Sequence, residues 1–190
     1  MTVIDWKERY PDLLDTDYQW TLPENADDLP QEVWRDWLLA PGSLTQRLQR
    51  LSDNAFAVEV VEAAWVSATP DYLAALGIQQ ADAVWSRRVA LLGCETPWVV
   101  AHSYFASATG RKPPRVGTAI DAILTLGRQP LGALLFEHPQ MQRGPIEICK
   151  TRTGWGRRSR FSLDGEPIVV AEYFLEALLH YVTDKQVVPE

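Results

Sequence analysis

The feature that most constrains the fold of this chain is an Asp-Gly pair between two β-rich runs. Asp164 and Gly165 separate RRSRFSL from EPIVVAEYFL. Such a pair is one of the strongest local signals for a β-hairpin, because a tight two-residue turn needs positive φ angles. Residues 154 to 175 are therefore predicted to form two antiparallel strands.

Glu172 lies in the middle of the second, apolar run. An ionised carboxylate is costly to bury there without a partner. A two-residue turn sets Phe161 opposite Ile168 and Arg157 opposite Glu172, whereas a loop one residue longer would substitute Arg158. Two interpretations stay open at this point. The pair is either a cross-strand ion pair that stabilises the sheet, or a carboxylate kept at a binding cavity by arginines that also attract an anionic ligand.

Composition excludes several classes of protein. The 190 residues suit one domain, and 46% of them are hydrophobic, as in a globular core. The net charge of −7 opposes nucleic acid as a main partner, because the cluster at Arg157, Arg158 and Arg160 is too small a basic patch. The N-terminal residues lack the pattern of a secretory signal, and no apolar run is long enough to insert in a membrane. We therefore expect a cytoplasmic protein, and we expect a monomer.

No metal or cofactor site is expected. Cys94 and Cys149 have neither a disulfide framework nor a metal-ligand spacing, and both are predicted to be free thiols in core or strand positions. The three histidines are far apart in the sequence, and His102, alone in a strand, is interpreted as structural. The chain also lacks a Gly-rich phosphate loop and a nucleophile elbow. Any chemistry must rest on arginine and glutamate with backbone donors.

The remaining elements alternate between helices and strands. Residues 1–29 carry no clear period and are predicted to be an N-terminal arm that packs loosely, while residues 30–190 form the domain. Most strands are joined by hairpins, so the fold class is α+β, built on an antiparallel sheet. The predicted helices cover residues 31–39, 44–53 after the N-cap Ser43, part of 69–81, and 118–126. The tail at residues 177–183 is predicted to be a short helix or an irregular cover, and residues 107–116 a loop. The remaining predicted strands cover residues 55–66, with a bulge at Ala63-Ala64, and 143–152.

A second hairpin places an arginine on an apolar face. It joins AVWSRRVALL to WVVAHSYFA, and Arg87 lies two residues from both Trp85 and Val89. By the two-residue period of a strand, these three side chains face the same way. An arginine on such a face needs a carboxylate, either in the protein or on a ligand. Arg88 faces the opposite way.

Several motifs resemble those of the chorismate pyruvate-lyase (chorismate lyase) family. They are DWLLAPGSLTQRL, WSRRVALL followed by PWVVA, LGRQPLGALLF, the IEI strand, and GWGRRSRFSLDGEPIVVAEYFL, in the same order from about residue 34 to 175. The resemblance implies a single antiparallel β-sheet with helices packed on one side and helical flaps over an internal site. It also implies that chorismate is split into 4-hydroxybenzoate and pyruvate, the first step of ubiquinone biosynthesis, without a cofactor.

The resemblance also implies the site residues. Carried over position by position, the substrate-binding residues are Leu44, Arg87, Leu131 and Glu172, of which Arg87 and Glu172 are catalytic. The family often has methionine at position 44 and Gly-Arg where this chain has Ala101-His102, so ligand affinity and flap packing are expected to differ.

Each of these residues has a chemical role under this hypothesis. Chorismate is a dianion, so Arg87 offers a bidentate partner for one carboxylate, and a backbone N–H near Leu131 adds a donor. Leu44 covers the ring. Glu172 meets the C4 hydroxyl, where it either orients the ring or helps to remove the C4 proton. The alternative is a domain that senses an aromatic acid, like the effector-binding domains of some transcription regulators, although no DNA-binding module is attached.

Overall fold

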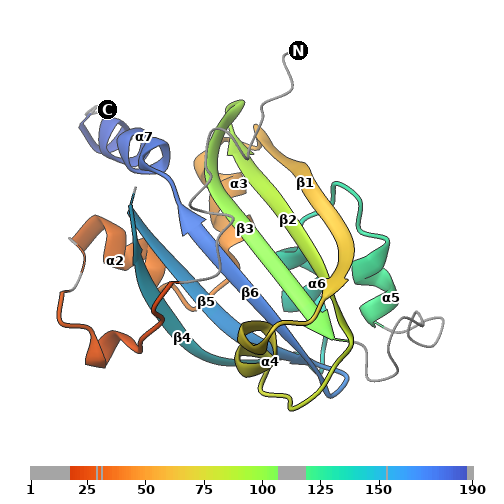
Figure 1. Cartoon of the computed structure of the whole chain (residues 1–190). Helices are drawn as coiled ribbons and strands as arrows, with labels where there is room; N and C mark the ends of the chain where they lie inside the picture. The colour runs from red at the N-terminus through yellow and green to blue at the C-terminus, as the bar shows by residue number, and fades with distance from the viewer. Residues whose placement is uncertain (1–17, 29, 31, 107–118, 153, 188–190) are drawn as a thin grey trace.

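A single antiparallel sheet organises the chain (Figure 1). The structure, a computed structural model, describes residues 18–28, 30, 32–106, 119–152 and 154–187. Within these residues the sheet has six strands in the order β1-β2-β3-β6-β5-β4, and every neighbouring pair is antiparallel. The strands are β1 (Phe56–Ser67), β2 (Ala83–Gly93), β3 (Thr96–Ala106), β4 (Gln142–Thr151), β5 (Gly154–Leu163) and β6 (Glu166–Phe174).

The two predicted hairpins meet at the centre of this sheet. Asp164 and Gly165 have φ angles of 53° and 85°, as a tight turn between β5 and β6 requires. The turn sets Arg157 opposite Glu172, so the predicted register is confirmed. Strand β3 of the β2–β3 hairpin then pairs with β6, which brings distant segments of the chain into one face.

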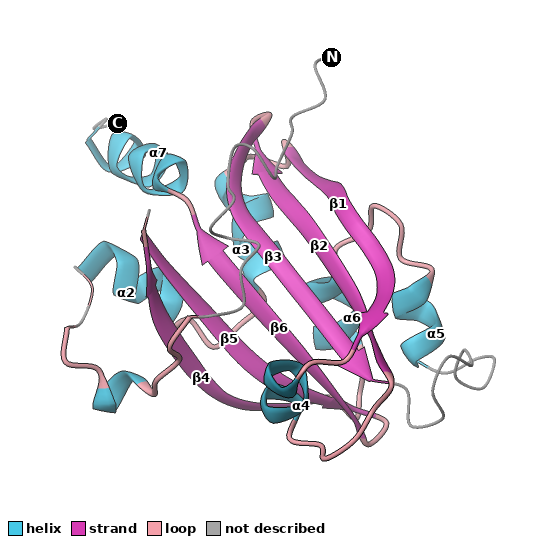
Figure 2. Ribbon diagram, in the orientation of Figure 1, coloured by secondary structure: helices cyan, strands magenta, loops and turns pink. Residues whose placement is uncertain are grey.

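Most helices lie on the face of the sheet that carries Arg87 and Glu172, which we call the inner face. Figure 2 shows α3 and α6 behind the sheet and α4 in front of it. The α+β class and the helical cover of one face are confirmed, and α4 adds a helix on the outer face, where Tyr72 and Leu76 pack against Val169. The helices are η2 (Pro23–Asn25), α2 (Glu32–Leu38), α3 (Leu44–Leu51), α4 (Pro70–Leu76), α5 (Ala119–Leu124), α6 (Leu131–Glu137) and α7 (Glu176–Val187).

Two apolar clusters cover the inner face and leave a band of polar side chains between them. One cluster holds Leu44 with Val89 and Phe174, and the other holds Leu131 with Phe161 and Ile168. Between them lie polar side chains from four strands, all on the inner face by register. We call this set the polar belt: Arg87, Ser103, Arg157, Ser159 and Glu172.

Three details differ from the sequence prediction or extend it. The bulge in β1 falls between Val60 and Glu62, where the pairing with β2 shifts, and not at Ala63-Ala64. Cys94 is a free but exposed thiol in the β2–β3 turn, so its predicted core or strand position was wrong, whereas Cys149 is buried in β4. The tail is helical over α7.

Parts of the predicted arm and loop lie outside the described residues. These parts are residues 1–17 of the arm and the predicted loop at 107–116. Of the arm, Thr21 forms two backbone hydrogen bonds with Ile148 of β4, at 3.0 and 2.8 Å. No helix among the described segments is long and apolar enough to cross a membrane.

Candidate functional site

Arg157 and Glu172 form a buried ion pair on the inner face. Arg157 Nε donates to Glu172 Oε2 at 2.5 Å, and the two side chains are 2% and 16% exposed. Arg157 Nη1 also donates to the carbonyl oxygens of Trp37, Leu38 and Ala40, at 3.2, 3.4 and 2.9 Å. The predicted cross-strand pairing is therefore confirmed. In addition, Arg157 anchors the end of α2 and the connection to α3 over the sheet.

Arg87 is the other buried arginine of the polar belt. Arg87 is 3% exposed, and its Nη2 donates to the carbonyl oxygens of Gly127 and Gln129, both at 2.9 Å. Burial lowers the pKa of Arg87. Among the residues that the structure describes, no carboxylate forms an ion pair with it. A buried guanidinium with only neutral acceptors is a ready site for an anionic ligand group.

Leu44 and Leu131 occupy the first positions of α3 and α6. They are 4% and 7% exposed, and Ser43 caps α3 by accepting a hydrogen bond from the Gln46 N–H. The two helices meet closely: a Cβ atom on Gly132 would lie 2.6 Å from Thr45 Oγ1. The connections before them are held to the sheet by Arg157 and Arg87 respectively. The α2–α3 and α5–α6 segments are therefore placed over the site as the helical flaps implied by the family resemblance would be.

Sequence reasoning missed Arg143, a third arginine on this face. Its Nε donates to Ser159 Oγ at 3.0 Å and its Nη1 to the Pro41 carbonyl oxygen at 2.8 Å. Burial and nearby Arg157 lower the pKa of Arg143 to about 10, while Glu172 acts in the opposite direction. The β4–β5 register shifts between Arg143 and Ile146, and a bulge of this kind redirects side chains.

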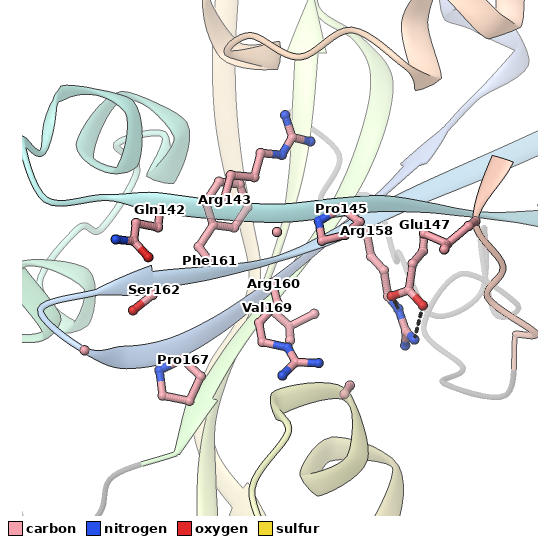
Figure 3. A pocket seen from close by; sticks show the side chains of 14 residues that line it. Gln142, Arg143, Pro145, Glu147, Arg158, Arg160, Phe161, Ser162, Pro167 and Val169 are labelled. Atoms are coloured by element: carbon pink, nitrogen blue, oxygen red, sulfur yellow. Dashed lines mark hydrogen bonds and ion pairs between the residues drawn. The ribbon is translucent and has the colours of Figure 1, made fainter. Parts of the chain in front are cut away.

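A groove of about 610 Å³ lies on the outer face, between β4–β6 and α4 (Figure 3). Its walls include Arg158, which pairs with Glu147 at 2.8 Å, as well as Arg160 and Pro167. In Figure 3 the Arg143 guanidinium leaves β4 on the side opposite to Arg160 and Pro167. Arg143 thus presents its charge to the inner face and the polar belt.

A second pocket, of about 330 Å³, opens at the start of α3. It is lined by residues of the α2–α3 connection, by Arg157, and by four residues of α3, which are Leu44, Gln46, Arg47 and Arg50. The Arg157 end of the polar belt therefore borders an open space at the edge of the flap.

His102 faces away from the polar belt. It is buried on the outer face, where Nε2 lies 2.9 Å from Ser86 Oγ. Burial, and then the charge of Arg88, lower the pKa of His102 to about 3, so its ring stays neutral at physiological pH. Its neighbour Ala101 is on the inner face and pairs with Glu172. Of the two departures at this position, Ala101 therefore borders the site and His102 does not.

The site has the chemistry of a two-ended receptor for an anion. One end is a buried cation, Arg87, and the other is the carboxylate of Glu172, fixed by Arg157. Within the described ranges, no group of three or more His, Cys, Asp or Glu side chains is placed to hold a metal ion. The four residues expected from the resemblance lie on this face or at the start of the flaps that cover it.

A family profile and two similar proteins from Pseudomonas indicate the same family. A family profile described as chorismate lyase matches residues 15–185. A "probable chorismate pyruvate-lyase" of Pseudomonas savastanoi pv. phaseolicola is 37% identical over 177 residues, which cover 87% of this chain and 92% of that protein. The protein of the same description from Pseudomonas syringae pv. syringae is 38% identical over the same shares.

Solved structures are similar at a greater distance. A transcriptional regulator of the GntR family from Bacillus cereus is 13% identical, with a TM-score of 0.45, over 65% of this chain and 93% of that one. A similarity of this size carries no argument about activity.

Proposed function

We propose that this chain, a lyase that belongs to the chorismate lyase family, splits chorismate into 4-hydroxybenzoate and pyruvate at the polar belt. The reaction would be the first step of ubiquinone biosynthesis. The observation that carries the assignment is the unequal state of two buried arginines on one face: Arg157 has the carboxylate of Glu172, while Arg87 has only neutral carbonyl acceptors. The alternative, a sensing domain, is not favoured by the family match.

Arg87 binds the ring carboxylate of the substrate. Its guanidinium can form two parallel hydrogen bonds with a carboxylate, and burial strengthens that interaction because little water competes. The carbonyls of Gly127 and Gln129 hold the guanidinium at the base of the α5–α6 flap. The start of α6 at Leu131 offers a backbone N–H that the helix leaves unpaired.

Glu172 binds the hydroxyl at the opposite end of the ring. In the sheet, Arg87 and Glu172 are two strands and two residues apart, which places their Cα atoms about 12 Å from each other. Because Arg157 occupies Glu172 Oε2, the other carboxylate oxygen accepts from the C4 hydroxyl and orients the ring.

The reaction itself needs little from the protein besides position and charge. The ring loses the C4 hydrogen and the enolpyruvyl ether at C3, and it becomes aromatic, so the elimination is downhill without a cofactor. Fixed charges at both ends of the ring, in a site from which Leu44 and Leu131 exclude water, stabilise the transition state. That the protein acts as a monomer, in the cytoplasm, and without nucleic acid or a cofactor stays a prediction.

The decisive experiment is to incubate the purified protein with chorismate and a metal chelator. We expect 4-hydroxybenzoate and pyruvate in equal amounts. Binding of chorismate without turnover would favour the sensing domain, and the absence of both binding and turnover would refute the two hypotheses together.

The roles of the two ends are tested by comparing Arg87→Ala with Glu172→Ala. Loss of the buried guanidinium is expected to weaken binding of 4-hydroxybenzoate by roughly 100-fold, since truncating one partner of a buried charged contact costs about 2–5 kcal/mol. Glu172→Ala is expected to lower kcat more than affinity. Arg88→Ala is the matched control, because Arg88 is the next residue but faces outward and pairs with Glu62. Equal effects of both variants on kcat and affinity would contradict this division of roles.

A further inference from the structure

The proposed substrate carries a second negative charge that Arg87 does not reach. Chorismate has one carboxylate on the ring and another on the enolpyruvyl group, whereas 4-hydroxybenzoate keeps only the first. If the substrate is chorismate, as proposed above, the second carboxylate also enters a mostly buried site. A charge in such a site is costly without a cationic partner.

The orientation of the ring decides where this second carboxylate lies. Arg87 binds the ring carboxylate at C1, and Glu172 meets the hydroxyl at C4. The enolpyruvyl ether is attached to C3, next to C4. It therefore projects from the Glu172 end of the polar belt, towards β5 and β4, which carry Arg157 and Arg143.

Arg157 is already committed at this end. It is 2% exposed, and its hydrogen bonds go to Glu172 and to three backbone carbonyls of the α2–α3 region. Its single positive charge is already balanced by Glu172, so a second carboxylate beside it would bring an uncompensated negative charge into the site.

Arg143 is free to act. It is half-buried, its hydrogen bonds go to two neutral oxygens, Ser159 Oγ and the Pro41 carbonyl, and no carboxylate pairs with it within the described part of the chain. Its guanidinium packs 5.4 Å from the centre of the Phe161 ring, which holds it on the inner face. Ser159, its hydrogen-bond partner, stands between Arg157 and Phe161 on the same face of β5.

We propose that Arg143 binds the enolpyruvyl carboxylate and so distinguishes the substrate from the product. As the C3–O bond breaks, its electron pair passes to the ether oxygen, which leaves as enolpyruvate. The electrons of the C4–H bond complete the aromatic ring as the C4 hydrogen leaves as a proton. The enolpyruvate takes up one proton on its CH₂ carbon, directly or through solvent, and becomes pyruvate, so no net proton is gained or lost. A cation beside the leaving group stabilises the charge that develops on it. After the reaction Arg143 has no contact with 4-hydroxybenzoate.

The test is to measure KM and kcat for chorismate, and Kd for 4-hydroxybenzoate, in Arg143→Met and Arg143→Lys. We expect Arg143→Met to raise KM for chorismate roughly 30-fold or more, with a lower kcat, while Kd for 4-hydroxybenzoate changes less than about 3-fold. Arg143→Lys keeps the charge and should restore part of KM. The matched control is Arg160→Met, a nearby arginine that faces the outer groove, and it should change neither value.

The competing explanation is that Arg143 only holds the α2–α3 flap through Pro41. In that case KM for chorismate and Kd for 4-hydroxybenzoate would rise together, and this result would overturn the proposal. If Arg143→Met does not fold, the test rests on Arg143→Lys. A ratio of KM for chorismate to Kd for 4-hydroxybenzoate that is the same in this variant as in the wild type would overturn the proposal equally. Failure of the wild-type protein to convert chorismate would instead refute the proposed function, so the two failures are distinguishable.

Discussion

Replacing Glu172 by Gln is expected to lower the free energy of unfolding by about 3 kcal/mol, because it leaves Arg157 charged and buried without its counter-ion. The guanidinium cannot deprotonate to escape the penalty. Breaking a buried ion pair by removing one partner costs about 3–5 kcal/mol. We take the lower end of this range because Arg157 keeps three backbone carbonyl acceptors and Glu172 is 16% exposed.

Urea denaturation measures this loss directly. With a slope of about 2 kcal/mol per molar urea, the midpoint should fall by about 1.5 M. The matched control is Glu147→Gln on the same sheet. Its partner Arg158 is the next residue after Arg157 and faces the other side, and this pair is 20% and 35% exposed. An ion pair so accessible to water contributes at most about 1 kcal/mol.

A double variant separates the pair from its surroundings. Arg157→Met combined with Glu172→Gln removes both charges, so its cost should be about 2 kcal/mol less than the sum of the two single costs. Equal midpoints for Glu172→Gln and Glu147→Gln would refute the reasoning, since Arg157 would then not depend on Glu172. The fixed carboxylate on which the proposed orientation of the ring rests would be lost with it.

Two further predictions concern the flaps and the outer face. Gly132→Ala should destabilise the protein by about 1–3 kcal/mol and raise KM for chorismate, because the new Cβ would lie 2.6 Å from Thr45 Oγ1. The control Gly42→Ala should be neutral, because the space around Gly42 is open. Equal melting temperatures of the two variants would contradict this prediction. His102, whose pKa is about 3 when folded against 6.5 as a free side chain, stabilises the folded state fully above pH 6.5 and progressively less as the pH falls towards 3. Between pH 7 and 5 the wild type should therefore lose about 2 kcal/mol of unfolding free energy more than His102→Gln does, as measured by urea denaturation, and parallel losses would count against a buried neutral imidazole.

Local signals were sufficient for the hairpins and their register. The Asp164-Gly165 turn determines which residues of β5 and β6 face each other, and alternation then sets the face of each side chain. A two-residue turn pairs Arg157 with Glu172 and a loop one residue longer would pair Arg158, so the structure of the turn decided between the two arginines. In the same way, the two-residue period placed Arg87 with Trp85 and Val89 on one face. The resemblance of the motifs to one family added the reaction and the role of Leu44 and Leu131, which no local pattern indicated.

Contacts between distant segments decided the rest. The β3–β6 pairing brings Arg87 and Glu172 onto one face of the sheet. The sequence did not predict this pairing, because the order of strands depends on packing that no local pattern encodes. The carbonyls of Gly127 and Gln129 that hold Arg87 belong to a connection 40 residues further along the chain. Arg143 looked like an ordinary strand residue, and a bulge followed by a bond to Pro41, 102 residues away, turned it towards the site. The sequence by itself determined the charged groups and the faces on which they lie, whereas only the tertiary structure decided which of those charges were already neutralised and which were left for a ligand, since that depends on atoms brought together from the whole chain.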